Sequence, residues 1–279
     1  SRAMSPKASD DGAPSARDGA HANARGARRA AEAARAAPVD VEDVALGAYA
    51  RARGDDASPG VVLVHDVWGL RDHPRDLARR LAAEGFRVLA VDLYRRVEPV
   101  AIADPGPWMQ EFSDPPVLAD LEAGARFLRE RARDGGAARV GVVGFCMGGM
   151  YALLAACGAE GFDASVPFYG LLSHAHGVLH REGGLDPARK PHEPLAVAHA
   201  LRCPMLAFFG ADDALVPLAD VRALERALAR ARRPSEVVVV EGAGHAFMND
   251  TRPEAFRPEA AARAWTRTVA FLREQLGGA

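Results

Sequence analysis

Residues 139–149 read Arg-Val-Gly-Val-Val-Gly-Phe-Cys-Met-Gly-Gly, and this stretch decides the fold. An apolar run from Val140 to Phe145 leads into Gly-x-Cys-x-Gly and then into a helical pattern from Gly148 to Cys157. Strand, sharp turn and helix form the context of a nucleophile elbow, which exposes a reactive side chain above the end of a strand. Glycine suits positions 144 and 148, because bulk there would collide with neighbouring backbone. We therefore expect Cys146 to be a nucleophile.

A cysteine occupies the place where serine usually stands in this motif. The partial positive charge of a helix N-terminus favours the thiolate form of such a cysteine. Two other interpretations remain open: Cys146 could be a small buried apolar residue, or the glycines could form a nucleotide-binding turn. The dinucleotide fingerprint G-x-G-x-x-G is absent, and none of the nine serines has a Gly-x-Ser-x-Gly frame. Cys157 and Cys203 lack this frame, and we expect them to be structural.

Apolar runs and helical patterns alternate on both sides of this motif. Strands fed by crossover helices predict an α/β fold with a mostly parallel sheet covered by helices on both faces. The longest irregular stretch, 171–201, is the expected place for an inserted cap or active-site loop. The predicted strands are 61–64, 86–91, 140–145, 164–169, 204–209 and 236–240, and the predicted helices are 74–84, 117–133, 148–157, 217–232 and 259–275.

The composition is typical of a globular protein. Of 279 residues, 49% are hydrophobic and 26% charged, and the formal net charge is -2. This balance favours neither nucleic acid nor membrane as a partner, and no apolar stretch is long enough to span a bilayer. Three scattered cysteines fit a reducing, cytoplasmic setting. Residues 1–38 carry almost no large apolar side chain and are predicted to be a disordered tail, whereas 39–279 are predicted to form one catalytic domain.

A general base and an orienting carboxylate follow the cysteine in the chain. Asp212 and Asp213 come directly after the predicted strand 204–209, and His245 lies in a glycine-lined loop after strand 236–240. The order nucleophile, acid, histidine is that of α/β hydrolases. Asp213 is the preferred orienter, but Asp212 is an alternative, and either could cap the next helix. His245 could instead be an ordinary loop histidine.

A group of histidines at 174, 176 and 180 could suggest a metal site. It has no carboxylate at ligand spacing and no H-E-x-x-H pattern, so the sequence favours a solvated loop and no metal.

Taken together, these motifs resemble the dienelactone hydrolases, a family of the α/β-hydrolase superfamily. The resemblance runs from about Val61 to Leu272. It rests on five segments: His-Asp-Val-Trp-Gly-Leu at 65–70, Asp-Leu-Tyr at 92–94, Gly-Phe-Cys-Met-Gly-Gly at 144–149, Gly-Ala-Asp-Asp at 210–213 and Gly-Ala-Gly-His-Ala-Phe at 242–247.

The resemblance implies a Cys146-His245-Asp213 triad and an oxyanion hole formed by the backbone N–H groups of Val67 and Met147. It also implies a small-molecule ester or lactone substrate and no cofactor. Expected substrate-binding residues are Asp66, Trp68, Arg96 and Asn249, while Trp108, Met109 and Phe112 are candidate pocket walls.

Two positions depart from the family pattern. Many relatives carry glutamate where Asp66 stands, and some use two arginines to hold a substrate carboxylate. Arg96 matches one of these arginines, whereas Asn249 occupies the place of the other. We therefore expect weak selectivity for anions. A general esterase or thioesterase, and a redox-sensing or binding protein without catalysis, remain alternatives. We expect a monomer or small homo-oligomer.

Overall fold

The computed structural model describes residues 38–97, 101–133 and 138–277. The tail expected over residues 1–38 lies outside these ranges, except for Pro38. Within these ranges, eight strands form a single sheet in the order β1-β2-β4-β3-β5-β6-β7-β8. Strand β2 is antiparallel to both β1 and β4, and every neighbouring pair from β4 to β8 is parallel. The strands are β1 (Val39–Val44), β2 (Gly47–Ala52), β3 (Gly60–Val64), β4 (Arg87–Val91), β5 (Val140–Phe145), β6 (Ala164–Phe168), β7 (Met205–Gly210) and β8 (Ser235–Val240).

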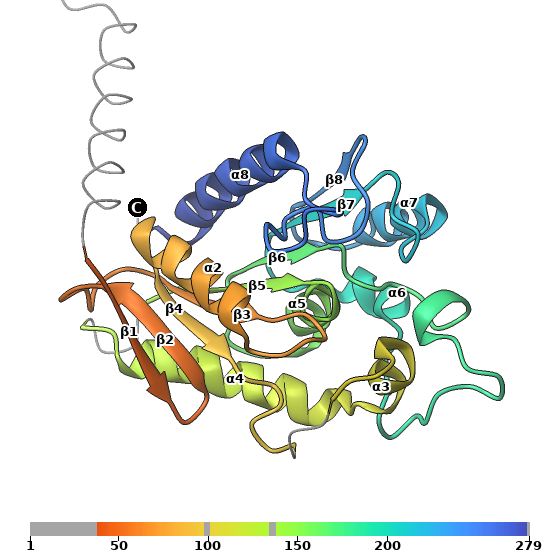
Figure 1. Ribbon diagram of the computed structural model, residues 1–279, viewed down its shortest axis with the longest axis horizontal. Coiled ribbons are helices and arrows are strands. Elements are labelled where there is room, and N and C mark those ends of the chain that lie inside the picture. The colour runs from red at the N-terminus through yellow and green to blue at the C-terminus, as the bar shows by residue number, and fades with distance from the viewer. Residues whose placement is uncertain (1–37, 98–100, 134–137, 278–279) are drawn as a thin grey trace, which may run out of the picture.

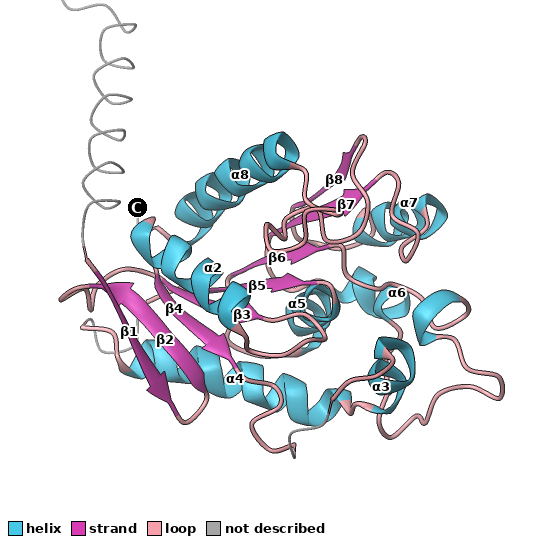
Figure 2. Cartoon of the chain, in the orientation of Figure 1, coloured by secondary structure: helices cyan, strands magenta, loops and turns pink. Residues whose placement is uncertain are grey.

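Helices cover both faces of this sheet, as Figures 1 and 2 show. One apolar core lies between the sheet and α4, α5 and α7, and the other lies between the sheet and α2 and α8. The predicted α/β-hydrolase fold, mostly parallel with helices on both faces, is confirmed. The helices are α2 (Asp72–Ala83), α3 (Pro105–Glu111), α4 (Asp114–Glu130), α5 (Met147–Gly158), α6 (Pro194–Val197), α7 (Leu218–Leu228) and α8 (Pro258–Leu276), with short 3-10 turns η1 (Gly177–Leu179) and η2 (Ala198–Ala200).

The sequence of each helix explains the face it buries. In α2 the buried residues Pro74, Leu77, Ala78, Leu81 and Ala82 recur at helical spacing, so a single stripe packs on the sheet. In α5 every residue from Met147 to Cys157 is buried, because this helix lies in the middle of the molecule. None of the helices in the described ranges is both long and apolar enough to cross a lipid bilayer.

The strand order fixes the position of the site. The chain passes from β3 to β4 on one side and returns to β5 on the other side of β3. Ligands of open α/β sheets bind at the carboxyl ends of the strands where the order reverses. The loop after β3 and the turn after β5 therefore face each other across this crevice.

Candidate active site

Cys146 lies in the sharp turn between β5 and α5. Its backbone has φ 56° and ψ -117°, an unusual conformation for a residue with a side chain. Glycines permit the turn: a Cβ on Gly144 would lie 1.9 Å from the carbonyl oxygen of Gly148, and one on Gly148 would lie 2.2 Å from that of Val64. The Cys146 N–H donates to the Phe168 carbonyl at 3.0 Å. The turn is thus tied to the neighbouring strand β6.

His245 and Asp213 come from the loops after β8 and β7. His245 Nδ1 lies 2.8 Å from Asp213 Oδ2. The other carboxylate oxygen of Asp213 accepts the backbone N–H groups of Leu215 at 2.8 Å and Val216 at 3.2 Å. The Asp213 side chain is fully buried, whereas Asp212 is exposed. Of the two adjacent acids, Asp213 is therefore the one whose carboxylate contacts His245.

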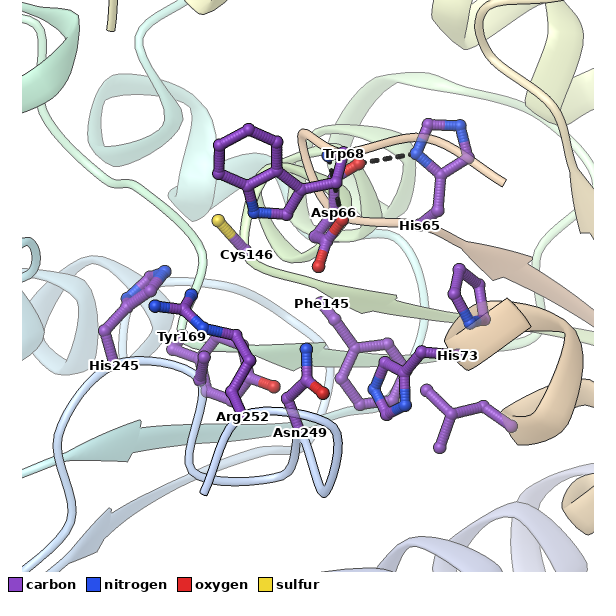
Figure 3. Close-up of a pocket in the computed structure, with 13 residues that line it drawn as sticks. His65, Asp66, Trp68, His73, Phe145, Cys146, Tyr169, His245, Asn249 and Arg252 are labelled. Carbon is purple, nitrogen blue, oxygen red and sulfur yellow. Dashed lines mark hydrogen bonds between the residues drawn. The ribbon is translucent and has the colours of Figure 1, made fainter. Parts of the chain in front are cut away.

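The environment of His245 favours its protonated form. Burial lowers its pKa, but interaction with Cys146 and the hydrogen bond to Asp213 outweigh burial and raise the pKa to about 10. Within the described part of the chain, Nε2 is buried and makes no aligned hydrogen bond. Figure 3 shows the Cys146 sulfur above the His245 ring on the same side of the pocket. The ring is therefore available to exchange a proton with groups at Cys146.

Val67 and Met147 are the residues whose backbone N–H groups were expected to form an oxyanion hole. Both are buried, Val67 in the loop after β3 and Met147 at the first position of α5. Among the described residues, neither backbone N–H has an acceptor. Unpaired donors at a helix start and in an adjacent loop suit a developing negative charge.

A pocket with an empty volume of about 420 Å³, open solvent at its mouth included, surrounds Cys146 and His245. Among its lining residues, His65, His73 and Tyr169 were not predicted as site residues. The only signal for Tyr169 was its place at the end of a strand; its ring centroid lies 5.1 Å from that of His245. The lining residues are His65, Asp66, Trp68, His73, Pro74, Leu77, Phe145, Cys146, Tyr169, His245, Ala246, Asn249 and Arg252.

The structure brings Asp66, Trp68 and Asn249 to this pocket (Figure 3). Asp66 Oδ1 accepts the Trp68 N–H at 2.9 Å, and Trp68 is 36% exposed at the rim. Asn249 is buried, and its Oδ1 accepts from Thr251 N at 3.0 Å and Thr251 Oγ1 at 2.6 Å. Its amide nitrogen is left as a donor pointing toward Asp66 (Figure 3).

Arg96 is not brought to the pocket. Its guanidinium pairs with the Asp120 carboxylate on α4, Nη1 lying 3.1 Å from Oδ2 and Nη2 forming a second contact with Oδ1. A different arginine, Arg252, lines the pocket, and its guanidinium extends toward Cys146 and His245 in Figure 3. The arginine that lines the pocket is thus not the one that the resemblance indicated.

The remaining expected pocket walls lie elsewhere. Trp108 and Phe112 pack on Tyr94 with ring centroids 5.5 and 5.1 Å away, and Met109 is buried in the core on the α4 and α5 side. None of the three lines the pocket around Cys146.

The other two cysteines and the histidine group at 174, 176 and 180 do not line the pocket. Burial raises the thiol pKa of Cys157 and of Cys203 to about 12, so both thiols stay protonated at neutral pH. His176 Nε2 lies 3.2 Å from Asp220 Oδ1. Within the described ranges no group of three or more His, Cys, Asp or Glu side chains could hold a metal ion.

Comparisons with known proteins identify the family of the chain. Residues 46–276 match the sequence profile of the Dienelactone hydrolase family. The chain is 34% identical to a "Putative carboxymethylenebutenolidase" of Salmonella typhimurium, over 82% of this chain and 82% of that protein. It is 32% identical to a "Probable 2-oxo-3-(5-oxofuran-2-ylidene)propanoate lactonase" of Bradyrhizobium sp, over 79% and 85%.

Among solved structures, the chain is similar to a "Putative Dienelactone Hydrolase" from Klebsiella pneumoniae. The two share 30% sequence identity with a TM-score of 0.71, and the match covers 85% of this chain and 98% of that one. A family profile that spans most of the catalytic fold, together with this likeness in sequence and structure, decides the assignment. The chain belongs to the dienelactone hydrolase family of α/β hydrolases and is a hydrolase.

Proposed function

We propose that the chain cleaves a carboxylic ester or lactone through a Cys146-His245-Asp213 triad and a thioester acyl-enzyme. The observation that carries the proposal is the environment of His245. Its Nδ1 lies 2.8 Å from Asp213 Oδ2, and the interaction with Cys146 raises its pKa. A protonated histidine beside a cysteine at a helix N-terminus favours a thiolate–imidazolium pair.

Acylation would begin with attack of the Cys146 thiolate on the acyl carbon. The carbonyl electron pair moves to oxygen, where the N–H groups of Met147 and Val67 stabilise the negative charge; removing one such donor costs roughly 3–4 kcal/mol of barrier in a related site. The intermediate collapses to a thioester, and the leaving alkoxide takes the proton from His245.

Deacylation would use His245 in the opposite sense. Acylation removes the charge of Cys146, which is the largest influence raising the histidine pKa, so neutral His245 becomes a competent base. It takes a proton from water as the water oxygen attacks the thioester. Collapse of the second intermediate releases the carboxylic acid and restores the thiolate and the imidazolium. Asp213 keeps the ring orientation throughout.

The substrate is proposed to be small. The names of the relatives mention carboxymethylenebutenolide and a furan-type lactone, and both are small molecules. The departure at Asn249, together with the pairing of Arg96 to Asp120, supports acceptance of neutral esters and lactones.

The proposal is tested by incubating the purified chain with p-nitrophenyl acetate and measuring both p-nitrophenol release and intact protein mass. We expect an acetyl adduct on Cys146, located by peptide mapping after acid quenching. Cys146→Ala should abolish release and adduct, whereas Cys157→Ser and Cys203→Ser should keep near-normal rates. Full activity in Cys146→Ala would refute the triad. A wild-type protein that reacts with peroxide at Cys146 but hydrolyses no ester, lactone or thioester would support a redox sensor instead.

A further inference from the structure

The loop after β3 begins with His65, whose imidazole is buried between two backbone groups. The residue is 1% exposed. Its Nδ1 lies 2.6 Å from the carbonyl oxygen of Asp66, and its Nε2 accepts the backbone N–H of Leu93 at 3.1 Å. Both ring nitrogens are therefore used within the protein, and neither is left to act on a substrate.

These contacts fix the tautomer of His65. A backbone N–H can only donate, so Nε2 must be the unprotonated nitrogen that accepts from Leu93. Burial lowers the pKa of His65, more than the interactions with Asp66 and Asp92 raise it, so the ring is neutral at pH 7. Nδ1 therefore carries the hydrogen and donates it to the Asp66 carbonyl.

The acceptor of this hydrogen bond belongs to the same peptide group as the Val67 N–H. In a trans peptide the C=O and N–H point in opposite directions, and the described chain has no cis peptide bond. A donor that holds the Asp66 carbonyl therefore also sets where the Val67 N–H points. Figure 3 shows His65 and Cys146 on opposite sides of Asp66.

We propose that His65 is a positioning residue that aims the Val67 N–H at the oxyanion formed on Cys146. The inference rests on the proposed function, since it assumes that an ester or lactone is attacked there. His65 acts through the backbone and touches neither the substrate nor the sulfur.

A second contact holds the next peptide group. The Tyr94 hydroxyl donates to the Val67 carbonyl at 2.7 Å and lies 3.7 Å from the Met147 sulfur. Trp108 Nε1 donates to the same hydroxyl at 2.9 Å. Both peptide groups that include Val67 are thus fixed by buried or half-buried side chains. Such preorganisation is what an oxyanion hole requires, because donors that must reorient lose part of their effect.

Two substitutions separate the two hydrogen bonds of His65. In His65→Gln, the amide oxygen stands as many bonds from Cβ as Nε2 does, so it can accept from Leu93 while the donor to Asp66 is lost. In His65→Asn, the amide nitrogen stands in place of Nδ1, so the donor to Asp66 remains and the acceptor for Leu93 is lost. If His65 has only a structural role, each variant should lose hydrolytic activity in proportion to its loss of stability. If His65 positions the Val67 N–H, hydrolytic activity should fall in whichever variant lacks the hydrogen bond to the Asp66 carbonyl.

The experiment compares ester hydrolysis, iodoacetamide alkylation of Cys146 and thermal unfolding in the wild type and both variants. Alkylation needs the thiolate but forms no oxyanion. We expect His65→Gln to lose about 10²–10³-fold in kcat/KM, with alkylation rate and unfolding temperature close to wild type. His65→Asn should recover most of the rate although its unfolding temperature falls. Tyr94→Phe, which keeps the ring packing, should lower kcat/KM without slowing alkylation and serves if a His65 variant fails to fold.

The positioning role is overturned if His65→Gln hydrolyses esters at the wild-type rate. It is also overturned if hydrolysis and alkylation fall together in that variant. Failure of the proposed function looks different: the wild type would then form no acyl adduct on Cys146, whatever the state of residue 65.

Discussion

At the scale of single residues, the two neighbouring acids Asp212 and Asp213 show how the fold separates equal side chains. Both follow β7, yet only Asp213 turns inward and meets His245 at 2.8 Å, while Asp212 is exposed. The sequence favoured Asp213 but left Asp212 as an alternative, because two adjacent aspartates do not by themselves show which one faces the core. The backbone N–H groups of Leu215 and Val216 donate hydrogen bonds to the Asp213 carboxylate and hold it in this inward position.

Asp213→Asn should therefore reduce kcat by roughly 10⁴, since an amide favours the wrong histidine tautomer. Asp212→Asn is the matched control and should keep near-normal activity. Steady-state kinetics on a chromogenic ester, with circular dichroism to verify folding, checks the pair. The reverse ranking would assign the orienting role to Asp212.

The raised pKa of His245 predicts a pH dependence. The folded-state pKa, about 10, lies above the ordinary 6.5. Its contribution to stability is therefore fully present below about pH 6.5 and is lost as the pH rises through about 10. Because interaction with Cys146 is the largest cause that raises the pKa, Cys146→Ala should lower it. An NMR titration of the His245 ring in both proteins measures this; equal values would show that Cys146 does not face the histidine.

Selectivity for anions should depend on Asn249 and Arg252. Asn249 offers a neutral amide, whereas Arg252 lines the pocket as a cation. Charge-assisted hydrogen bonds are the stronger ones, so Asn249→Arg should raise, and Arg252→Gln should lower, the kcat/KM ratio of dienelactone to phenyl acetate by about tenfold, or ~1.4 kcal/mol. A ratio unchanged in Arg252→Gln would show that this guanidinium does not meet the substrate.

At the scale of elements, the helices that carry regular apolar patterns could be predicted closely. The helix expected over 148–157 is observed at Met147–Gly158, and that expected over 259–275 at Pro258–Leu276. The helix expected from Val117 begins at Asp114, because Pro115 and Pro116 occupy the first turn, where no N–H is needed.

Other features depend on contacts that no local pattern contains. The short helix Pro105–Glu111 was not predicted, since two prolines and a glycine in seven residues hide any periodicity. The pairing of Arg96 with Asp120 joins a loop to a helix 24 residues later in the sequence and removes this arginine from the site. The residues of the proposed triad could be predicted to lie close together because they follow strand ends, where the sequence motif and the fold are linked.

The nucleophile elbow itself predicts a contrast between two glycines of α5. A Cβ on Gly148 would lie 2.2 Å from a backbone oxygen, whereas one on Gly158 meets nothing within 4 Å. Gly148→Ala should destabilise the protein by about 1–3 kcal/mol or more and lower activity. Gly158→Ala should be neutral or stabilise by ~0.4–1 kcal/mol. Urea unfolding measures both changes, and equal stability of the two variants would contradict the crowded turn.

At the scale of the whole molecule, a buried ion pair joins the stretch 171–201 to helix α4. Lys190 Nζ donates to Asp114 Oδ1 at 2.6 Å, and Tyr151 of α5 donates to the same oxygen at 2.8 Å. The Lys190 and Asp114 side chains are 0% and 3% exposed. The Asp114 N–H also donates to the Arg189 carbonyl at 2.8 Å. The start of α4, the stretch 171–201 and helix α5 thus meet at this buried polar cluster.

Breaking this pair from one side should be costly, because the remaining charge stays buried. Lys190→Met should lower the free energy of unfolding by about 3–5 kcal/mol. Adding Asp114→Asn should recover part of the loss, since the neutral amide still accepts from Tyr151 and no longer needs a cation. Arg189→Met is the control: its side chain is 48% exposed, and its surface pairs are worth about 1 kcal/mol at most. Chemical denaturation of the four proteins measures the differences. If Lys190→Met matches the wild type in stability, the ion pair contributes nothing to stability, and apolar contacts alone hold the stretch 171–201 against helix α4.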